Sequence, residues 1–369
     1  MKIVFLVNVD WFFLSHRVPV AMAAREMGYD VYVVTGDSGR AKEITDLGFK
    51  FYPIPLERAG LHPVKELASF LSILRIYRKI KPDLVHQVTI KPIIYGSLAA
   101  RFTKIRRIIS MVSGLGYNFS PQAHGGARIR AFLLIYKLAV RSKKNKVIFQ
   151  NPDNMDYFIQ HRVIKRDQAV LIKGSGVDMN EFKYTPPAGG VVKFLFAARL
   201  LIDKGIREYL RMAEIMKVKY PSQAEFIVAG IIDPESPTMI SEEELLGAHN
   251  SGSIKWIGFK KDMKELLGSI DVMVLPSYGE GVPKVLIEAA AVGRPIIATD
   301  TPGCREIVID NKNGFLVPVK DAETLAQAAE KLIRDERLRL VMGRESRKLA
   351  EAEFSLDKVI EQTTELYRL

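Results

Sequence analysis

The sequence predicts an α/β protein of two doubly wound, Rossmann-like domains that face each other across a cleft. Short apolar runs of strand type alternate with segments of helical period along the whole chain, which is typical of parallel sheets covered by helices. The chain of 369 residues is too long for one core, because single hydrophobic cores stop growing near ~250–300 residues. Apolar residues make up 48% of the chain, which is enough to fill two cores.

The first domain is expected to cover residues 1–182. Its strands are the short apolar runs, and its helices are the segments whose apolar residues recur every three or four positions. The strands are expected at 2–8, 30–35, 50–54, 84–87, 107–112 and 147–150. The helices are expected at 15–27, 63–80, 92–102 and 128–140.

A linker is expected at 183–190, within the stretch Asn180–Gly190 (NEFKYTPPAGG), because prolines and glycines stand there with few core residues. The second domain follows at 191–352, and the segment 353–369 is expected to pack back on the first domain as a helix. The strands of the second half are expected at 192–197, 225–230, 253–257, 271–275, 295–298 and 314–317. Its helices are expected at 206–217, 262–267, 284–292, 322–334, 338–352 and 356–367.

Composition excludes several classes of protein. The single cysteine, Cys304, forms no internal disulfide, and no run of ~18 uncharged apolar residues offers a membrane span. The opening residues are interpreted as a strand, because a secretory signal would have a longer apolar stretch and a small-residue cleavage site. We therefore expect a cytoplasmic globular protein.

The positive charge is concentrated in the first half of the chain. Residues 1–185 hold 29 Lys/Arg against 14 Asp/Glu, a net charge of +15, whereas residues 186–369 have a net charge of −3. No acidic residue stands between Leu84 and Pro152. Such a field attracts nucleic acid, an anionic lipid surface or a phosphorylated substrate, or it only keeps the protein in solution.

The stretch Pro276–Glu288 (PSYGEGVPKVLIE) joins a predicted strand to a predicted helix through a glycine turn. Pro283 suits the first turn of that helix, because its missing N–H is not needed there. Free N–H groups and the positive end of the helix make a site for a diphosphate. Glu280 and Glu288 supply carboxylates that accept hydrogen bonds from paired sugar hydroxyls.

Two basic residues, Arg199 and Lys204, follow the first strand of the second domain in the segment AARLLIDKG. Basic groups at the carboxyl end of such a strand reach a ligand at that edge of the sheet. They neutralise a leaving diphosphate, Arg with two parallel hydrogen bonds and Lys as a point charge.

These motifs together resemble the family 4 retaining glycosyltransferases, which have the GT-B fold. The resemblance covers nearly the whole chain and rests on the pairs Glu280/Glu288 and Arg199/Lys204, LIKGSGVDMNEF (171–182), WIGF (256–259) and ATDTPGCREIVIDNKNGFLV (298–317). In the first domain, SHR (15–17), HQVTIKP (86–92) and SGLGY (113–117) resemble a bacterial branch that builds surface polysaccharides and lipid-linked oligosaccharides.

The resemblance implies a role for each motif residue. Glu288 would bind the ribose of a nucleotide sugar, Glu280 would bind the donor sugar, and Arg199 with Lys204 would bind the diphosphate. The other residues assigned to the nucleotide are Gly281, Val282 and Pro283 at the helix start and Phe259 and Lys260 at the base.

The resemblance also implies that the anomeric configuration is retained, by departure of the diphosphate and attack from the same face, without a metal. The sequence has no Asp-x-Asp, with which many metal-dependent glycosyltransferases hold a cation. We therefore expect the positive charge to come from Arg199, Lys204 and the helix terminus. No cofactor is expected, and a UDP-sugar is the expected donor substrate.

One departure from the family concerns a histidine. Many members carry a His-Asp pair after the fifth strand of the first domain, where this chain has Ser113 and Gly114. His86, at the end of the fourth strand, and His16, at the start of the first helix, are the candidates to replace it. Gly114 and Gly116 are expected to let the backbone approach the donor or acceptor closely.

The sequence thus predicts a hexosyltransferase or N-acetylhexosaminyltransferase that uses a UDP-sugar and a polyprenyl-diphosphate-linked saccharide in bacterial glycan assembly. A non-hydrolysing UDP-sugar epimerase and a transferase with a soluble acceptor are the alternatives. A nicotinamide oxidoreductase would need a Gly-x-Gly-x-x-Gly turn that neither first strand supplies. No nucleic-acid-binding motif accompanies the basic residues, so no nucleic acid partner is expected.

An anionic membrane surface is an expected partner, with the protein peripheral on the inner face of the plasma membrane. The cytoplasmic leaflet attracts basic groups at ~1 kcal/mol each. The segment Leu61–Ile80 adds an apolar face beside basic residues, and this face either enters the lipid or packs on the first sheet. Its members are Leu67, Phe70, Leu71, Leu74 and Tyr77, beside Arg75, Arg78 and Lys79. The donor sugar, the linkage and the oligomeric state are left open.

Overall fold

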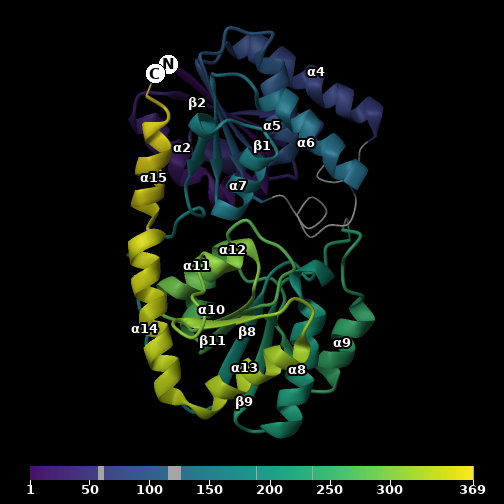
Figure 1. The fold of residues 1–369 in the computed structure, drawn as a ribbon, viewed down its shortest axis with the longest axis vertical. Coiled ribbons are helices and arrows are strands. Elements are labelled where there is room, and N and C mark those ends of the chain that lie inside the picture. Colours follow the sequence, from purple (N-terminus) through teal and green to yellow (C-terminus); the bar gives the residue numbers. More distant parts are fainter. Residues whose placement is uncertain (57–61, 115–125, 188, 235, 369) are drawn as a thin grey trace. The chain divides into compact units, whose positions relative to one another are not determined.

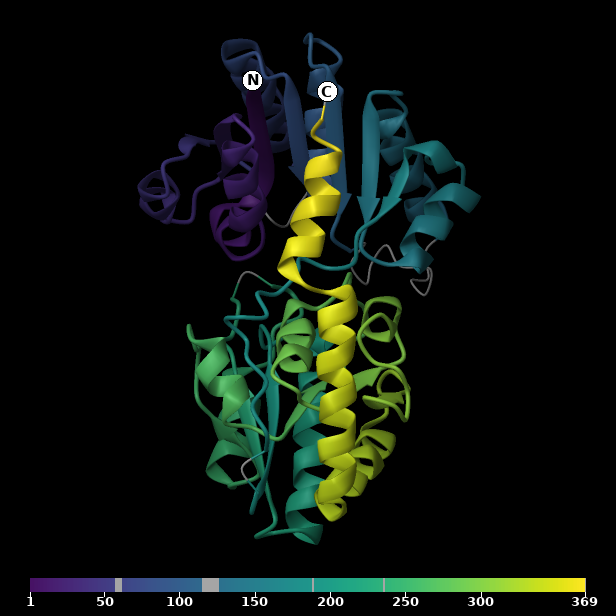
Figure 2. The same ribbon diagram turned by 90° about the vertical axis from the view of Figure 1, so that its left-hand side faces the viewer.

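The computed structural model divides the chain into two compact units (Figures 1 and 2). Unit 1 contains Met1–Ser175 and Asp357–Leu369, and unit 2 contains Gly176–Leu356. The structure describes the chain except for residues 57–61, 115–125, 188, 235 and 369 and the side chain of Arg128. Each unit is a parallel sheet covered by helices.

Unit 1 is built on a seven-stranded sheet with the order β3-β2-β1-β4-β5-β6-β7. The strands are β1 Lys2–Val9, β2 Asp30–Gly36, β3 Lys50–Pro53, β4 Leu84–Val88, β5 Arg107–Val112, β6 Asn145–Phe149 and β7 Ala169–Leu171. The helices are α1 Asp10–His16, α2 Val18–Glu26, α3 Ala41–Asp46, α4 Pro63–Ile80, α5 Ile90–Ala100, α6 Gly126–Val140, α7 Pro152–Gln160 and α15 Leu356–Glu365, with a 3-10 turn at Arg166–Gln168.

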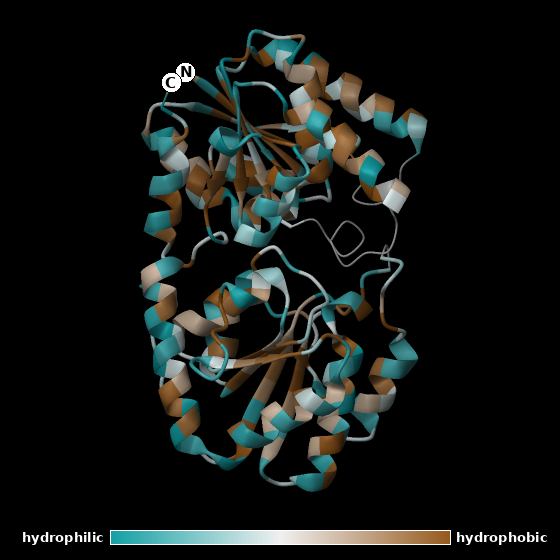
Figure 3. Ribbon diagram, in the orientation of Figure 1, coloured by the Kyte–Doolittle hydropathy of each residue, from teal (hydrophilic) through white to brown (hydrophobic). Residues whose placement is uncertain are grey.

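The central strand β1 is apolar on both faces. Successive strand residues point to opposite sides of a sheet. Phe5 accordingly packs with α1, α2 and α15, whereas Val4 and Leu6 pack with α4 and α5. Figure 3 shows the resulting hydrophobic strands between helices that turn polar residues outward. The strand order reverses between β1 and β4, which is where ligands bind in doubly wound sheets.

Unit 2 repeats this plan with a six-stranded sheet of order β10-β9-β8-β11-β12-β13. The strands are β8 Val192–Ala197, β9 Ala224–Ala229, β10 Lys255–Trp256, β11 Val272–Leu275, β12 Ile296–Thr299 and β13 Gly314–Val317. The helices are α8 Ile206–Lys219, α9 Glu242–Asn250, α10 Met263–Gly268, α11 Lys284–Ala291, α12 Pro302–Arg305, α13 Ala322–Arg334 and α14 Glu336–Glu353, with a 3-10 turn at Ile202–Lys204.

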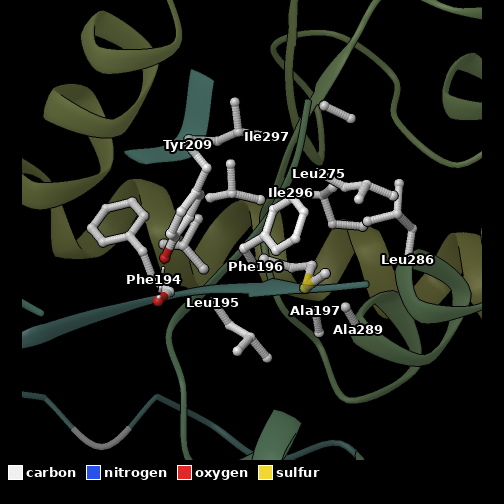
Figure 4. Packing of buried hydrophobic residues seen from close by; sticks show 14 of the residues in the cluster. Phe194, Leu195, Phe196, Ala197, Tyr209, Leu275, Leu286, Ala289, Ile296 and Ile297 are labelled. Atoms are coloured by element: carbon white, nitrogen blue, oxygen red, sulfur yellow. Dashed lines mark hydrogen bonds between the residues drawn. The ribbon is translucent and has the colours of Figure 1, made fainter. Parts of the chain in front are cut away.

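The core of unit 2 is centred on β8 (Figure 4). The ring of Phe196 lies 5.4 Å from that of Tyr209 on α8, and both side chains are fully buried. The Tyr209 hydroxyl donates a hydrogen bond to the Ile227 carbonyl at 2.9 Å. A buried phenol therefore keeps a partner while it fills the space between helix and sheet. The strand order reverses between β8 and β11.

The chain divides after Ser175, earlier than the expected linker at 183–190. Phe182 packs in the core of unit 2, and the Arg294 guanidinium donates to the Thr185 carbonyl at 2.8 Å. Proline and glycine indicate a lack of regular structure, which is compatible with close packing. The point of division therefore differs from the expected one.

The helix expected at 15–27 is two helices, α1 and α2, that meet at Arg17. Pro19 lies in the first turn of α2. Proline is tolerated there but cannot continue a preceding helix, since it has no N–H to donate. Five short elements are additions to the sequence prediction: α3, α7, α9, α12 and β7.

The C-terminal segment is anchored in unit 1 by Tyr367, whose side chain is fully buried. The Tyr29 hydroxyl donates to the Tyr367 carbonyl at 2.5 Å. The Arg107 guanidinium donates to the Leu366 carbonyl at 2.9 Å. Tyr29 lies between α2 and β2, and Arg107 lies in β5. These contacts explain why the last residues of the chain belong to unit 1.

Candidate active site

The two loops of unit 2 that carry the expected diphosphate residues lie next to each other. Strands β8 and β11 are paired neighbours at the reversal point, so their carboxyl ends lie at one edge of the sheet. The loop after β8 holds Arg199 and Lys204, and the loop after β11 holds Glu280. The Tyr278 N–H donates to the Asp203 carbonyl at 2.9 Å and joins the two loops.

Lys204 and Glu280 form an ion pair across these loops. The Lys204 Nζ lies 2.6 Å from the Glu280 Oε1, and the two side chains are only 18% and 13% exposed. Salt screens the attraction in such a shielded pair only weakly. Removing one partner would leave the other charge shielded from water without a counter-charge, which costs free energy. Two residues that the sequence assigned to one site are thus in direct contact.

Arg199 is paired with Asp233, which lies outside the motifs found in the sequence. The Arg199 Nη1 lies 2.9 Å from the Asp233 Oδ2, and the side chains are 42% and 10% exposed. Asp233 follows β9, the other neighbour of β8, so it reaches the same edge of the sheet. An acidic residue shortly after a predicted strand was the only signal for it.

Glu288 lies in α11 with its side chain 8% exposed. Burial raises the pKa of this carboxyl, and the Lys284 ammonium, 3.3 Å from the Glu288 Oε1, acts in the opposite direction. Pro283 is the N-cap of α11 rather than its first helical residue. Free N–H groups at the start of a helix suit an anion, and the assignment of the diphosphate to the start of α11 stays a prediction.

Gly303, at the start of α12, fixes how closely that helix approaches the Glu280 loop. A Cβ at Gly303 would lie 2.1 Å from the Gly281 carbonyl oxygen and 2.8 Å from the Glu280 carbonyl oxygen. Only glycine allows this approach. The Thr-Pro-Gly turn after a predicted strand was a signal for a special backbone position, but not for its contact with Gly281.

Phe259 and Lys260, expected near the base, follow β10. The Phe259 side chain is 70% exposed, so its ring is available for stacking. The preceding Trp256 is held by a hydrogen bond from its Nε1 to the Gly230 carbonyl at 2.9 Å. The assignment of these residues to the base stays a prediction.

Unit 1 has a comparable edge where β1 and β4 end. Asn8 Oδ1 and Thr89 Oγ1 are buried there without a hydrogen-bond partner among the described residues. Thr89 has a φ of 77°, which is strained for a β-branched residue. Two unpartnered oxygen atoms and a strained backbone at a reversal point favour a ligand site.

His16 is the last residue of α1 and not, as expected, at the start of the first helix. Its Nδ1 is 2.6 Å from the Ser15 Oγ, and its ring stacks on Phe12 with centroids 4.2 Å apart. Gly114, after β5, has a φ of 131°, which favours glycine. The roles of His16 and Gly114 stay predictions, and Gly116 lies outside the described residues.

His86 lies in the core of unit 1. Its side chain has no solvent exposure, its ring centroid is 5.2 Å from that of Phe5, and its Nδ1 is hydrogen bonded to the Tyr367 hydroxyl. Burial, together with the Arg17 guanidinium, lowers the pKa of His86 well below its usual value. His86 is therefore a poor candidate for the replacement catalytic histidine, because no part of its side chain is exposed to a substrate.

Asp10, directly after β1, holds the loop that follows β2. Its carboxylate accepts hydrogen bonds from the Ser38 N–H at 2.7 Å, from the Arg40 N–H at 3.1 Å and from the Trp11 N–H at 2.6 Å. Burial alone would raise the pKa of Asp10, but these bonds and the Ser38 hydroxyl outweigh it and lower the pKa. The ionised carboxylate therefore stabilises the edge where β1 and β2 end.

Replacing Asp10 by asparagine is expected to lower the free energy of unfolding by ~1–3 kcal/mol at neutral pH. Because the folded-state pKa is the lower one, this stabilisation is complete above the unfolded-state pKa and is lost as the pH falls through the folded-state pKa. Urea denaturation of both proteins between pH ~7 and ~3 checks this. A deficit that stays constant across that range would contradict the assignment.

The apolar face expected on the segment 61–80 mostly packs on the sheet of unit 1. Tyr77 is fully buried and Leu74 is 9% exposed, whereas Leu67, near the start of α4, is 58% exposed. Helix α4 is held against α5 by the Lys91 Nζ, 2.6 Å from the Glu66 Oε1. Insertion of this face into lipid is therefore contradicted for its C-terminal half.

Helix α6 also has exposed apolar residues. Leu134, Ile135 and Leu138 are 58%, 48% and 43% exposed. Lys137 and Arg141 are exposed beside them. Leu134 and Leu138 are four positions apart, so they share one face of the helix, and Arg141 follows its last residue.

Two searches of the described part of the chain were negative. It contains no group of three or more His, Cys, Asp or Glu side chains arranged to hold a metal ion. None of its helices is long and apolar enough to cross a membrane.

Two family descriptions match the chain, one in each half. Residues 2–151 match the description Glycosyl transferase 4-like, and residues 179–349 match the description Glycosyl transferases group 1. Together they account for most of unit 1 and most of unit 2.

Individual proteins resemble the chain over nearly its whole length. The N,N'-diacetylbacillosaminyl-diphospho-undecaprenol alpha-1,3-N-acetylgalactosaminyltransferase of Campylobacter jejuni is 29% identical over 93% of this chain and 92% of its own. The UDP-Gal:alpha-D-GlcNAc-diphosphoundecaprenol alpha-1,3-galactosyltransferase of Escherichia coli is 20% identical over 92% and 89%. The crystal structure of the Anabaena protein HepE in complex with UDP-glucose has a TM-score of 0.76 at 19% identity and covers 100% and 99% of the two chains. The expected fold of two Rossmann-like domains is confirmed.

Proposed function

The chain belongs to the family 4 glycosyltransferases, and we propose that it is a retaining enzyme that moves a hexose or N-acetylhexosamine from a UDP-sugar to a polyprenyl-diphosphate-linked saccharide. One observation carries the proposal. The Lys204–Glu280 pair lies where β8 and β11 end, so a cation for a diphosphate and a carboxylate for sugar hydroxyls are in contact at a reversal point.

The donor is held by unit 2. Glu288 accepts hydrogen bonds from the ribose hydroxyls, and the exposed ring of Phe259 stacks with the base. The diphosphate lies at the N-terminus of α11, close to Lys204 and Arg199. A UDP-sugar as donor is supported by the complex of HepE with UDP-glucose, a protein of the same fold.

The acceptor is supported by the names of two relatives. The C. jejuni and E. coli enzymes are both named for a saccharide linked to undecaprenyl diphosphate, the first as an N-acetylgalactosaminyltransferase and the second as a galactosyltransferase. In unit 1, the half-buried side chains of Asn8 and Thr89, where β1 and β4 end, would provide oxygen acceptors for its hydroxyl groups.

The reaction breaks the bond between the anomeric carbon and the β-phosphate oxygen. The acceptor hydroxyl attacks that carbon from the same face, and its proton passes to the departing β-phosphate oxygen. Lys204 and Arg199 stabilise the negative charge that grows on the diphosphate. Because these cations and the helix terminus supply positive charge, we propose that no metal is needed.

A panel of UDP-hexoses and UDP-N-acetylhexosamines with a polyprenyl-diphosphate-linked monosaccharide tests this function. We expect UDP release and a lengthened saccharide with one donor, retained configuration by NMR, and undiminished turnover in EDTA. Conversion of the UDP-sugar without acceptor would favour the epimerase. Equal turnover with a free sugar would favour a soluble acceptor, and restoration of chelated enzyme by manganese would contradict metal independence.

We further propose that the protein works peripherally at the cytoplasmic face of the membrane and that the exposed face of α6 contacts the lipid. Leu134 and Leu138 would enter the interface, while Lys137 and Arg141 would lie at anionic head groups. The absence of acidic residues from this part of the sequence leaves the field uncompensated.

Replacing Leu134 and Leu138 by serine is expected to weaken binding to anionic vesicles by at least ~10-fold, because each buried leucine contributes ~1.5–3 kcal/mol. The loss should be clearest at 1 M salt, where the Debye length of ~3 Å leaves only apolar contacts. The matched control replaces Val218 and Val341 of unit 2, which are 87% and 49% exposed. Co-sedimentation with vesicles measures the effect. Equal losses of binding in both double variants would exclude α6 as the lipid contact. No binding of the unaltered protein at low salt would exclude the membrane as a partner.

A further inference from the structure

Lys284 is the first residue of α11, an unfavourable place for a cation. The N-terminus of a helix carries partial positive charge, so lysine is disfavoured there. The first turn of α11 contains no acidic residue that would compensate. Instead, the ammonium lies 3.3 Å from the Glu288 Oε1, one turn further along the helix.

This pair is one of three of the same kind. Lys204 is paired with Glu280 at 2.6 Å, and Arg199 is paired with Asp233 at 2.9 Å. The three carboxylate side chains are 13%, 10% and 8% exposed, so all are largely shielded from water. Arg199, Lys204 and Lys284 thus each have a carboxylate partner.

A ligand that takes the cation of such a pair must leave the carboxylate satisfied. A buried carboxylate that loses its cation costs free energy. An ammonium also costs free energy when its carboxylate binds the hydroxyl groups of a ligand instead. Inorganic pyrophosphate would satisfy only the ammonium of Lys284. Uridine would satisfy only the carboxylate of Glu288.

We propose that the Lys284–Glu288 pair is an exchange site that opens only for ligands with both a diphosphate and a vicinal diol. The Lys284 ammonium moves to the diphosphate at the start of α11, while the Glu288 carboxylate receives the ribose hydroxyls. Lys284 is then a third cation for the donor. This inference rests on the proposed function, because it takes the nucleotide to bind at α11.

The exchange predicts opposite effects on two ligands in a single variant. Glu288→Gln removes the charge that holds Lys284, so inorganic pyrophosphate should bind ~3–10-fold more tightly, while UDP loses its diol contact and binds at least ~10-fold more weakly. Lys284→Gln should weaken the binding of UDP and should not weaken the binding of uridine. The affinity for pyrophosphate should change little in this variant, because pyrophosphate alone does not open the pair. Isothermal titration calorimetry of the full chain with UDP, pyrophosphate and uridine measures all three affinities.

The matched control is Glu330→Gln, which removes the same charge from an ion pair of unit 2 in which the Lys219 Nζ lies 2.7 Å from the Glu330 Oε2. It should leave the three affinities unchanged. If the Lys284–Glu288 pair only stabilised α11, both site variants would lower the melting temperature without changing the ratio of UDP to pyrophosphate affinity. That outcome, or weaker pyrophosphate binding in Glu288→Gln, would overturn the exchange. The proposed function would still hold if the unaltered protein binds UDP and transfers the sugar. No binding of UDP to the unaltered protein would overturn both.

Discussion

Replacing Glu280 by glutamine is expected to lower turnover by ~10²–10³-fold, as for other preorganised polar groups at a reacting centre. The amide keeps the size of the side chain and can still accept a hydrogen bond from Lys204. It loses the charge that holds the sugar hydroxyls and balances the shielded ammonium. Affinity for UDP should not fall, because UDP does not carry the sugar that Glu280 is proposed to contact.

Turnover of the UDP-sugar and calorimetric affinity for UDP separate the roles of the two glutamates. In Glu288→Gln, the affinity for UDP should fall, whereas in Glu280→Gln only turnover should fall. Glu345→Gln, which alters an exposed pair with Lys348 at 2.7 Å, is the matched control for the lost charge. Equal loss of UDP affinity in both site variants would show that the roles are reversed or shared.

Replacing Gly303 by alanine is expected to lower turnover by ~10²-fold, because a displacement of ~1 Å at a catalytic loop has effects of that size. The new Cβ would lie 2.1 Å from the Gly281 carbonyl oxygen, which is far inside the van der Waals contact. Backbone has to move, and the nearest backbone is that of the loop which carries Glu280. The Lys204–Glu280 pair should then lose its geometry.

Gly268→Ala in α10 is the control, because a Cβ there has open space within 4 Å and glycine is not required by φ. Turnover and thermal unfolding of both variants should be compared. We expect a lower melting temperature and a large loss of turnover for Gly303→Ala only. Unchanged turnover in that variant would mean that α12, and not the Glu280 loop, absorbs the displacement.

Long, strongly patterned elements could be predicted from the sequence with correct bounds. The strands 107–112 and 192–197 and the helices 63–80 and 322–334 have the bounds expected for them. Their hydrophobic period is a local property, because it follows from which side of one element is buried. The family motifs are also local, since each is a short run of residues that are neighbours in the chain.

Short elements and chain divisions could not be predicted in the same way. Helix α12 has four residues, too few for a period to show. The stretch 183–190 has the composition of a linker, yet the Thr185 carbonyl within it accepts a hydrogen bond from Arg294, more than a hundred positions away. Composition indicates local flexibility. It does not indicate which remote residues will form hydrogen bonds with the segment in the folded chain.

The sequence by itself was enough to predict two Rossmann-like domains and the glycosyltransferase family, and it supplied the proposal of which residues bind a diphosphate and sugar hydroxyls. Only the tertiary structure decided which polar groups remote in sequence meet: Asp233 with Arg199, Glu280 with Lys204, and the buried His86 with Tyr367. It also decided that α6, and not the C-terminal half of α4, exposes leucines. The physical reason is that periodicity and turns depend on neighbours in the chain, whereas ion pairing and burial depend on strand order, which brings together residues remote in sequence.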